Sequence, residues 1–551
     1  MRGTPLKLVM LVAVGVASVA AVVSSAGAKG GPTLVFAAAR DPKTLDPALV
    51  SDGESLRPIR QMMEGLVTLK PGTTVVRPSL ALSWSVTKNR LAWTFKLRRG
   101  VKFQDGTQFN AAAVCFNFNR WFNFKGPFQS PDATYYWQTV YGGFHHPEAG
   151  SPQGGSLYKG CKALKNGDAR IFLNNPSGSF IGSLAIPSFS MQSPTALQRY
   201  QADEGTVSGG VFRATGTYGT LHPTGTGPFV FQSWTLRDKL VLIRNTKYWG
   251  PKAKLQTLIF RPISDNAARL QALQTGEVQG YDLVAPEDVP TVSSNPKLKL
   301  LNRPAFNVGY VGFNQKIAPM NNPAVRQAVA YGLDREGVVK AFYGGRGQVA
   351  DEFMPPQVIG YAKDVQKYTY DPAKAKDILT KAGFKLPVEL DFWYPTSVSR
   401  PYMPDPQRNF EAFAASLEKS GFKITPHSAP WSPDYLGKVQ SGQAQLYLLG
   451  WTGDYGDPDN FVGTFFRTAQ DQWGFNNPGL FDLLNKAREE TSLAKRIAMY
   501  QDANRQIMKF LPGVPYVHST PALAFQKRVK GYIPSPVSLE PFQLVSIVGG
   551  T

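Results

Sequence analysis

A short segment rich in glycine and aspartate, residues 450–461, is where the sequence most clearly offers a charged group for recognition. The apolar run Leu446–Leu449 predicts a buried strand, and two glycines and a Gly-Asp-Pro turn are expected to end it. Asp454 then lies at the carboxyl end of a strand, where open α/β sheets hold ligands. A fixed carboxylate there suits a cation such as a free amine. The alternative is a turn aspartate that only accepts hydrogen bonds from nearby backbone amides.

Sequence motifs for covalent or metal chemistry are missing. The chain has no G-x-S-x-G, H-E-x-x-H, C-x-x-C or phosphate-loop pattern. Of its five histidines only His145 and His146 are neighbours, and such a pair on a loop more often faces water than holds a metal. The aspartates of the 450–461 segment do not form a calcium loop, because Pro458 interrupts it and Phe465 stands where glutamate is needed. We therefore expect binding rather than catalysis, with no catalytic residue, metal or cofactor.

Strand and helix patterns alternate along the chain. Residues 33–38 are apolar, and residues 91–97 alternate between apolar and polar, so both predict strands. Capping residues predict helices, and these begin after Asn110, at Asn322-Pro323 and at Asp371-Pro372. No repeat of 20 to 50 residues is present. The alternation predicts an α/β protein with mixed sheets.

The first 28 residues read as a secretory signal. Arg2 and Lys7 precede an apolar run, and Ala26-Gly27-Ala28 offers a cleavage site. The run is short for a membrane span, and no cysteine near the cleavage site supports a lipid anchor. We expect a cleaved, exported, soluble chain, in the periplasm or at the outer face of the cell envelope; an uncleaved membrane anchor is the alternative. The remaining length of about 520 residues suits two or three domains.

The charge pattern limits the classes of binding partner, and the cysteine content limits the possible disulfides. The net charge is +21, but the 60 basic residues are scattered singly or in pairs without a stripe, so we do not expect nucleic-acid binding. Cys115 and Cys161 are the only cysteines. An exported chain permits a disulfide between them, and a buried free thiol at Cys115 is equally open, because Ala111–Phe116 reads as a buried helix face.

A series of short motifs gives the chain a family resemblance. Each is weak alone, but their order and spacing are specific, and they are Glu64–Val67, Pro78–Trp84, Thr94–Gly106 with its F-x-D-G loop, Gly225–Phe229, Asn307–Tyr310, Val325–Ala328, Tyr368–Ala375, Arg400–Tyr402, Gly450–Phe461 and His518–Thr520. The chain resembles extracellular solute-binding family 5, whose dipeptide- and oligopeptide-binding members serve ABC importers.

The resemblance implies a fold, a two-lobed clamshell of the class II, cluster C type. A first lobe would use residues 33–70, 226–305 and 515–551. An extra domain, residues 71–225, would pack on it, and residues 306–514 would form the second lobe. The ligand would lie between the lobes and be buried when the hinge closes.

The resemblance also implies a binding site. In peptide-binding members, an aspartate at the position of Asp454 pairs with the α-ammonium of the ligand, and an arginine at the position of Arg400 pairs with its carboxylate. The other residues expected at the site are the candidate walls Trp431 and Trp451, the loop residues Ser51 and Gly53, and Tyr402, Thr452, Gly453 and Tyr455. A tyrosine at 455 is typical of oligopeptide binders rather than dipeptide binders, so ligand length stays open.

Three hypotheses follow. The first is a receptor, expected to be a monomer, that binds short peptides and delivers them to an ABC permease with a cytoplasmic ATPase. The second keeps the fold but changes the solute to a nickel chelate, haem, an opine or an oligosaccharide. The third, an exported hydrolase, lacks any recognisable nucleophile and base.

Overall fold

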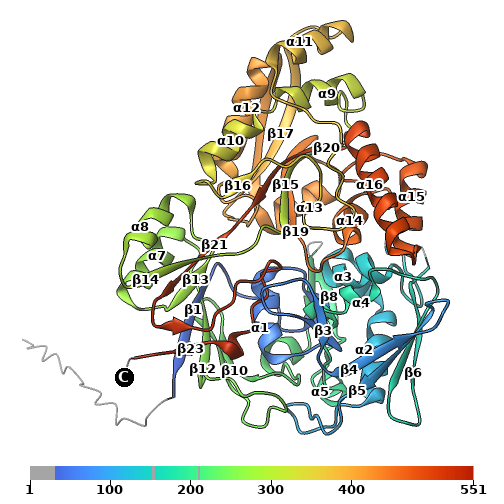
Figure 1. Ribbon diagram of the computed structural model, residues 1–551, viewed down its shortest axis with the longest axis vertical. Helices are drawn as coiled ribbons and strands as arrows, with labels where there is room; N and C mark the ends of the chain where they lie inside the picture. The colour runs from blue at the N-terminus through green and yellow to red at the C-terminus, as the bar shows by residue number, and fades with distance from the viewer. Residues whose placement is uncertain (1–30, 150, 152–154, 209–210, 550–551) are drawn as a thin grey trace, which may run out of the picture.

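The computed structural model describes residues 31–549 except 150, 152–154 and 209–210, so the predicted signal lies outside the described residues. Figure 1 shows two α/β lobes, one above the other, each built on a mixed sheet. Among the described residues, no helix is long and apolar enough to cross a membrane.

The first lobe is built on a seven-stranded sheet whose strands come from distant parts of the chain. In spatial order they are β10 (Phe229–Thr235), β11 (Lys239–Arg244), β12 (Thr257–Pro262), β1 (Thr33–Ala38), β13 (Gly280–Asp282), β21 (Ala522–Gln526) and β14 (Leu298–Asn302). Strand β1 runs parallel to both neighbours, which explains its unbroken apolar sequence. The helices of this part are α1 (Gly53–Met62), α7 (Asn266–Thr275) and α8 (Val289–Ser294).

The second lobe is built on a six-stranded sheet. In spatial order its strands are β16 (Gly347–Gln348), β20 (Gly513–Ser519), β15 (Asn307–Phe313), β19 (Leu446–Thr452), β17 (Val388–Thr396) and β18 (Phe422–Pro430). Every residue of β15 and β20 is buried, so these strands form the centre of the lobe. Its helices are α9 (Pro323–Gly332), α10 (Arg335–Phe342), α11 (Pro372–Lys381), α12 (Pro406–Lys419), α13 (Leu436–Gln440), α14 (Val462–Phe466), α15 (Pro478–Glu489) and α16 (Leu493–Phe510).

Smaller sheets and short helices make up most of residues 71–225, which we call the 71–225 region. A four-stranded sheet has the order β4 (Ala81–Val86), β5 (Ala92–Leu97), β7 (Ala169–Leu173) and β6 (Tyr158–Ala163). Two-stranded pairs are β2 (Val67–Leu69) with β3 (Val76–Pro78), β8 (Gly205–Ser208) with β9 (Val211–Ala214), and, near the C-terminus, β22 (Val529–Lys530) with β23 (Ser546–Ile547). The helices are α2 (Ala111–Phe122), α3 (Pro131–Tyr141), α4 (Phe180–Ser183), α5 (Pro194–Arg199) and α6 (Tyr218–Leu221).

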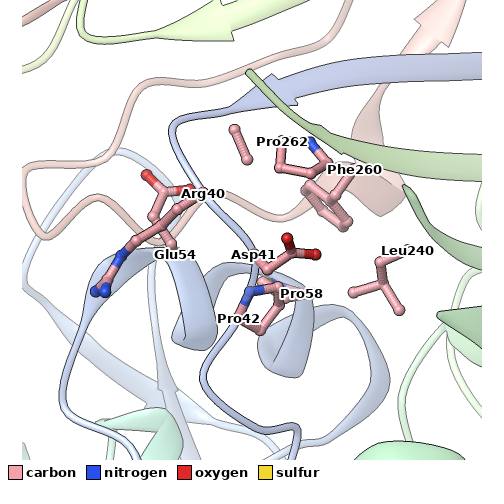
Figure 2. A pocket seen from close by; sticks show the side chains of 9 residues that line it. Arg40, Asp41, Pro42, Glu54, Pro58, Leu240, Phe260 and Pro262 are labelled. Carbon is pink, nitrogen blue, oxygen red and sulfur yellow. The ribbon is translucent and has the colours of Figure 1, made fainter. Parts of the chain in front are cut away.

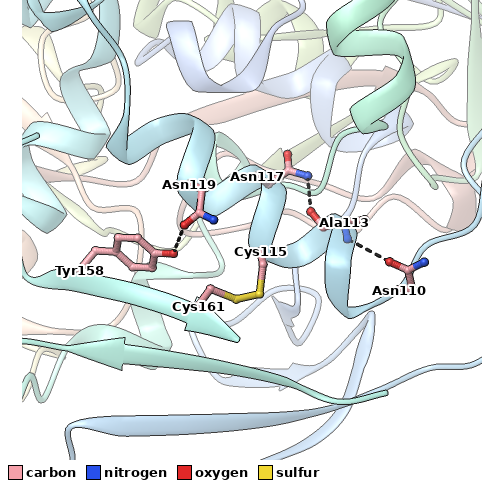
Figure 3. Close-up of a disulfide and its surroundings, with 7 residues drawn as sticks. All are labelled: Asn110, Ala113, Cys115, Asn117, Asn119, Tyr158 and Cys161. Carbon is pink, nitrogen blue, oxygen red and sulfur yellow. Dashed lines mark hydrogen bonds between the residues drawn. A yellow bond between two sulfur atoms is a disulfide. The ribbon is translucent and has the colours of Figure 1, made fainter. Parts of the chain in front are cut away.

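A disulfide joins Cys115 on α2 to Cys161 on β6, which decides between the two alternatives for these cysteines (Figure 3). The helix that carries Cys115 begins where the sequence predicts, with the Asn110 side chain accepting a hydrogen bond from the Ala113 amide at 3.0 Å. The disulfide therefore fastens helix α2 to β6, the edge strand of the four-stranded sheet.

Two chain segments cross between the lobes, residues 303–306 and 520–521. They run side by side, because the Arg303 amide donates to the Pro521 carbonyl at 2.9 Å. The Arg303 side chain is buried and forms ion pairs with Asp282 and Glu540. Because β20 pairs with β15, residues 515–519 belong to the second sheet and not to the first lobe, where the sequence-based boundary at 515 places them. The chain returns to the first sheet only at β21, as the red segment in Figure 1 shows.

Candidate ligand-binding site

The loops that carry Asp454 and Arg400 emerge at one edge of the second sheet. Strands β17 and β19 run parallel, with Phe392 opposite Leu446. Their carboxyl ends therefore point the same way, and Arg400 follows the first strand as Asp454 follows the second. This is the kind of sheet edge at which α/β folds bind ligands.

Neutral groups hold Asp454 in place. The side chain is only 8% exposed. Its Oδ1 accepts a hydrogen bond from the Tyr136 hydroxyl at 2.6 Å, and its Oδ2 accepts one from Asn460 Nδ2 at 3.1 Å. The Asp454 amide donates back to Asn460 Oδ1 at 2.6 Å. The carboxylate is thus fixed from two sides, one of them on helix α3 of the 71–225 region.

The charge of Asp454 has no basic partner within ion-pair distance anywhere in the described chain. Burial raises the pKa of Asp454 to about 6, although the hydrogen bonds from Tyr136 and Asn460 oppose this shift. A buried carboxylate without a counter-ion is costly, and a ligand cation would relieve that cost.

Arg400 carries the opposite charge, and it too lacks an ion-pair partner among the described residues. Its guanidinium carbon lies 4.1 Å from the centroid of the Trp431 ring, a cation–π contact. Its Nε is buried without a hydrogen-bond partner, and the described residues supply no ion pair to it. Burial lowers the pKa of Arg400, and Arg40 lowers it further. A carboxylate would satisfy the free face of this side chain through charge-assisted hydrogen bonds.

The loop before α1 approaches Arg400. Burial alone would raise the pKa of Asp52, but Arg40, Ser55 and Arg400 outweigh burial and hold it below its usual value. The Asp52 carboxylate bonds Arg40 at 2.9 Å and caps α1. Ser51 beside it is exposed, whereas Gly53 is the first residue of α1. Gly53 therefore belongs to a helix, whereas the sequence analysis places it in a loop.

Two further polar atoms beside Asp454 lack partners. The Trp451 Nε1 and Thr452 Oγ1 atoms are buried, and no described residue forms a hydrogen bond with either. The Trp451 ring packs against Tyr135 of the 71–225 region, with centroids 6.1 Å apart. Unsatisfied buried polar atoms are uncommon in native proteins, so their clustering here marks a place for a ligand or for water.

The remaining predicted site residues have packing roles. The Tyr402 ring lies so close to Gly450 that a Cβ there would be 2.3 Å from it. Gly453 is needed because a side chain would strike Phe306 at 2.3 Å. Tyr455 is 3% exposed, and its ring packs against Gly182 in the 71–225 region.

A cavity in the first lobe is not part of this site. It lies among Arg40, Asp41, Glu54 and apolar side chains that include Leu240 and Phe260 (Figure 2). Its free volume is about 10 Å³, at most enough for one water molecule. The Asp41 carboxylate is already bonded by Trp234 Nε1 at 2.9 Å.

Sequence patterns did not identify two residues of the site, Tyr136 and Asn460. Tyr136 lies 318 residues from Asp454 in sequence, in a loop-rich stretch with no helical pattern, so no local signal could have paired them. Asn460 is closer, and an asparagine six residues after an aspartate across a Gly-Asp-Pro turn was a usable signal. Among the described residues, no group of three or more His, Cys, Asp or Glu side chains could hold a metal ion.

Known proteins are similar to this chain in both sequence and fold. A model of the middle region of bacterial extracellular solute-binding proteins, family 5, matches residues 75–473. A dipeptide-binding protein of Escherichia coli is 32% identical over 94% of each chain. Heme-binding protein A of Haemophilus influenzae is 31% identical over 94% of this chain and 92% of its own. The structure of a periplasmic binding protein from Helicobacter pylori, in complex with the peptide STSA, has a TM-score of 0.80 at 27% identity, covering 94% of this chain and 99% of its own.

The two α/β lobes, each built on a mixed sheet, define a clamshell binding protein. The chain belongs to the bacterial extracellular solute-binding proteins of family 5. It is a receptor for a solute and not an enzyme. The prediction of a two-lobed α/β clamshell is confirmed.

Proposed function

We propose that this protein binds a short peptide between its lobes and delivers it to an ABC permease at the outer face of the cell envelope. Asp454 accepts the α-ammonium and Arg400 binds the carboxylate. One observation carries the proposal: a buried carboxylate and a half-buried guanidinium follow two parallel strands at one sheet edge, and neither forms an ion pair with a described residue. A zwitterion supplies both missing charges in one molecule.

The names of the relatives support a peptide. The Escherichia coli relative is called a dipeptide-binding protein, and the Helicobacter pylori structure holds a four-residue peptide. The packing of Tyr455 on Gly182 removes the reason to read ligand length from that residue. The distance between the two charged loops, when a ligand is bound, is the feature we expect to select for length.

Calorimetry with free and end-blocked peptides tests the proposal. We expect di- to tetrapeptides to bind, and acetylation or amidation of the ends to remove binding. Asp454→Ala should cost about 2–4 kcal/mol of binding free energy, because it removes the acceptor of the ammonium. Asp482→Ala is the matched control, since the Asp482 side chain is 60% exposed and its ion pair is with Lys486.

A different result would identify a different solute. The Haemophilus influenzae relative is called a heme-binding protein, so haem belongs in the panel with nickel, opines and oligosaccharides. Equal affinity of the Asp454→Ala variant and the unchanged protein for a free peptide would refute the role of Asp454. Binding of haem but of no peptide would leave the fold in place and replace the cargo.

A further inference from the structure

A cavity between the lobes holds a second arginine next to Arg400. Its walls include Leu283 and Ala522 from the first lobe and Arg346, Arg400 and Ser519 from the second. Its free volume is about 30 Å³, the space of one water molecule in the liquid. The cavity is therefore part of the cleft, beside the group proposed to bind the ligand carboxylate.

The charge of this cavity is entirely positive. The described residues that line it include two arginines and no aspartate, glutamate or histidine. The hydroxyl residues Ser399, Ser519 and Thr520 also line it. Two arginines beside one small space favour an anionic group there, although the Ser519 and Thr520 hydroxyls already donate to the Pro401 and Arg346 carbonyls.

Arg346 forms no ion pair with an acidic side chain in the part of the chain that the structure describes. Its Nη1 donates to the Asn302 side chain, and its Nε is buried without a partner among the described residues. Burial lowers the pKa of Arg346, and no neighbouring carboxylate opposes the shift. Its guanidinium is therefore in the same condition as that of Arg400, charged and incompletely satisfied.

Backbone contacts hold the two arginines around the cavity. The Arg346 carbonyl accepts a hydrogen bond from the Thr520 amide at 2.8 Å. The Ser519 hydroxyl donates to the Pro401 carbonyl, next to Arg400. The end of β20 thus anchors both arginine-bearing loops, so the second-lobe wall of the cavity is fixed.

We propose that Arg346 and Arg400 form an anionic subsite for a second carboxylate at the C-terminal end of the ligand, so that peptides ending in an acidic residue bind preferentially. The inference rests on the proposed function, because it needs Arg400 to bind the terminal carboxylate. The acidic side chain of the last residue then points to this cavity, where its carboxylate takes the space of the one water molecule that fits and is bound by Arg346.

Calorimetry at pH 7 with Ala-Glu, Ala-Gln and Glu-Ala tests this subsite. Ala-Gln has the same shape as Ala-Glu without the charge, and Glu-Ala has the same charge at the wrong end. We expect Ala-Glu to bind at least about 10-fold more tightly than either, the effect of one hydrogen-bonded charge. In Arg346→Gln the ratio of Ala-Glu to Ala-Gln affinity should fall to about one, and Arg346→Lys should keep part of it.

The outcomes separate this inference from the proposed function. Each readout is a ratio between two ligands on one variant, so a general loss of affinity in a variant cancels. Tight binding of Ala-Gln with no preference for Ala-Glu would overturn the subsite and leave the peptide receptor standing. A preference that persists in Arg346→Gln would also overturn it. If neither peptide binds the unchanged protein, the proposed function fails and the subsite fails with it.

Discussion

A single buried carboxylate governs how this site depends on pH. Because burial raises the pKa of Asp454 to about 6, the folded protein holds a proton there over a pH range in which the unfolded chain does not. This group alone therefore makes the ligand-free protein less stable as the pH rises from about 4 to about 6. The ionised form that a ligand ammonium needs is the form that the empty site disfavours.

Peptide affinity should therefore increase as the pH rises through about 6 and then level off. At pH 5 about nine-tenths of Asp454 is protonated, so affinity should be about 10-fold lower than at pH 7.5. The peptide ends stay ionised over this range, with pKa values of about 8 and about 3.5. Calorimetry from pH 5 to 7.5 measures the effect. The Asp454→Asn variant is the control and should show weak binding with little pH dependence. A flat profile for the unchanged protein would contradict the role of Asp454.

At the scale of the element, strand β19 shows what sequence patterns predict and where they stop. The strand itself was predictable from its apolar run, but Gly450 does not end it, and it continues to Thr452. The glycine is required by packing: a Cβ there would lie 2.3 Å from the Tyr402 ring and 2.4 Å from the Val308 carbonyl oxygen. The sequence does not distinguish a glycine that close packing requires from a glycine that ends a strand.

Gly450→Ala should disturb both the lobe and the carboxylate site. We expect a loss of about 1–3 kcal/mol in stability, as for other overpacked cores. Because the new methyl displaces Tyr402, the adjacent Arg400 should move, and affinity for free peptides should fall. Thermal unfolding and calorimetry measure the two effects. Gly437→Ala is the matched control, since a Cβ there meets nothing within 4 Å. Unchanged stability and affinity in Gly450→Ala would show that Tyr402 does not position Arg400.

At the scale of the whole molecule, the site depends on contacts between distant segments. Helices whose caps are local, such as those after Asn110 and Asp371, begin where the sequence predicts. The Tyr136–Asp454 contact and the cavity at Arg346 could not be predicted, because each joins parts of the chain brought together only by packing. The resemblance to a family identified Asp454 and Arg400, but it carried no information on these supporting residues.

Contacts between the 71–225 region and the second lobe report on closure around the ligand. The Gly178 amide donates to the Arg488 carbonyl at 2.9 Å, and Ser179 Oγ donates to Asp459 Oδ2 at 3.1 Å. If the lobes must open to admit a peptide, the Gly178 amide exchanges with solvent only in the open form. A bound peptide should then slow its hydrogen exchange by up to about 100-fold at 100 times the dissociation constant.

Exchange measured by mass spectrometry or NMR, with and without peptide, gives the result. The Gly106 amide is the internal control, because it bonds the nearby Phe103 carbonyl at 2.9 Å and does not cross between lobes. Its exchange should not depend on the ligand. In Asp454→Asn the same peptide concentration should fail to protect Gly178, since the variant binds weakly. Equal protection of Gly178 with and without peptide in the unchanged protein would mean that the lobes do not separate at this contact, and that ligand enters by another movement.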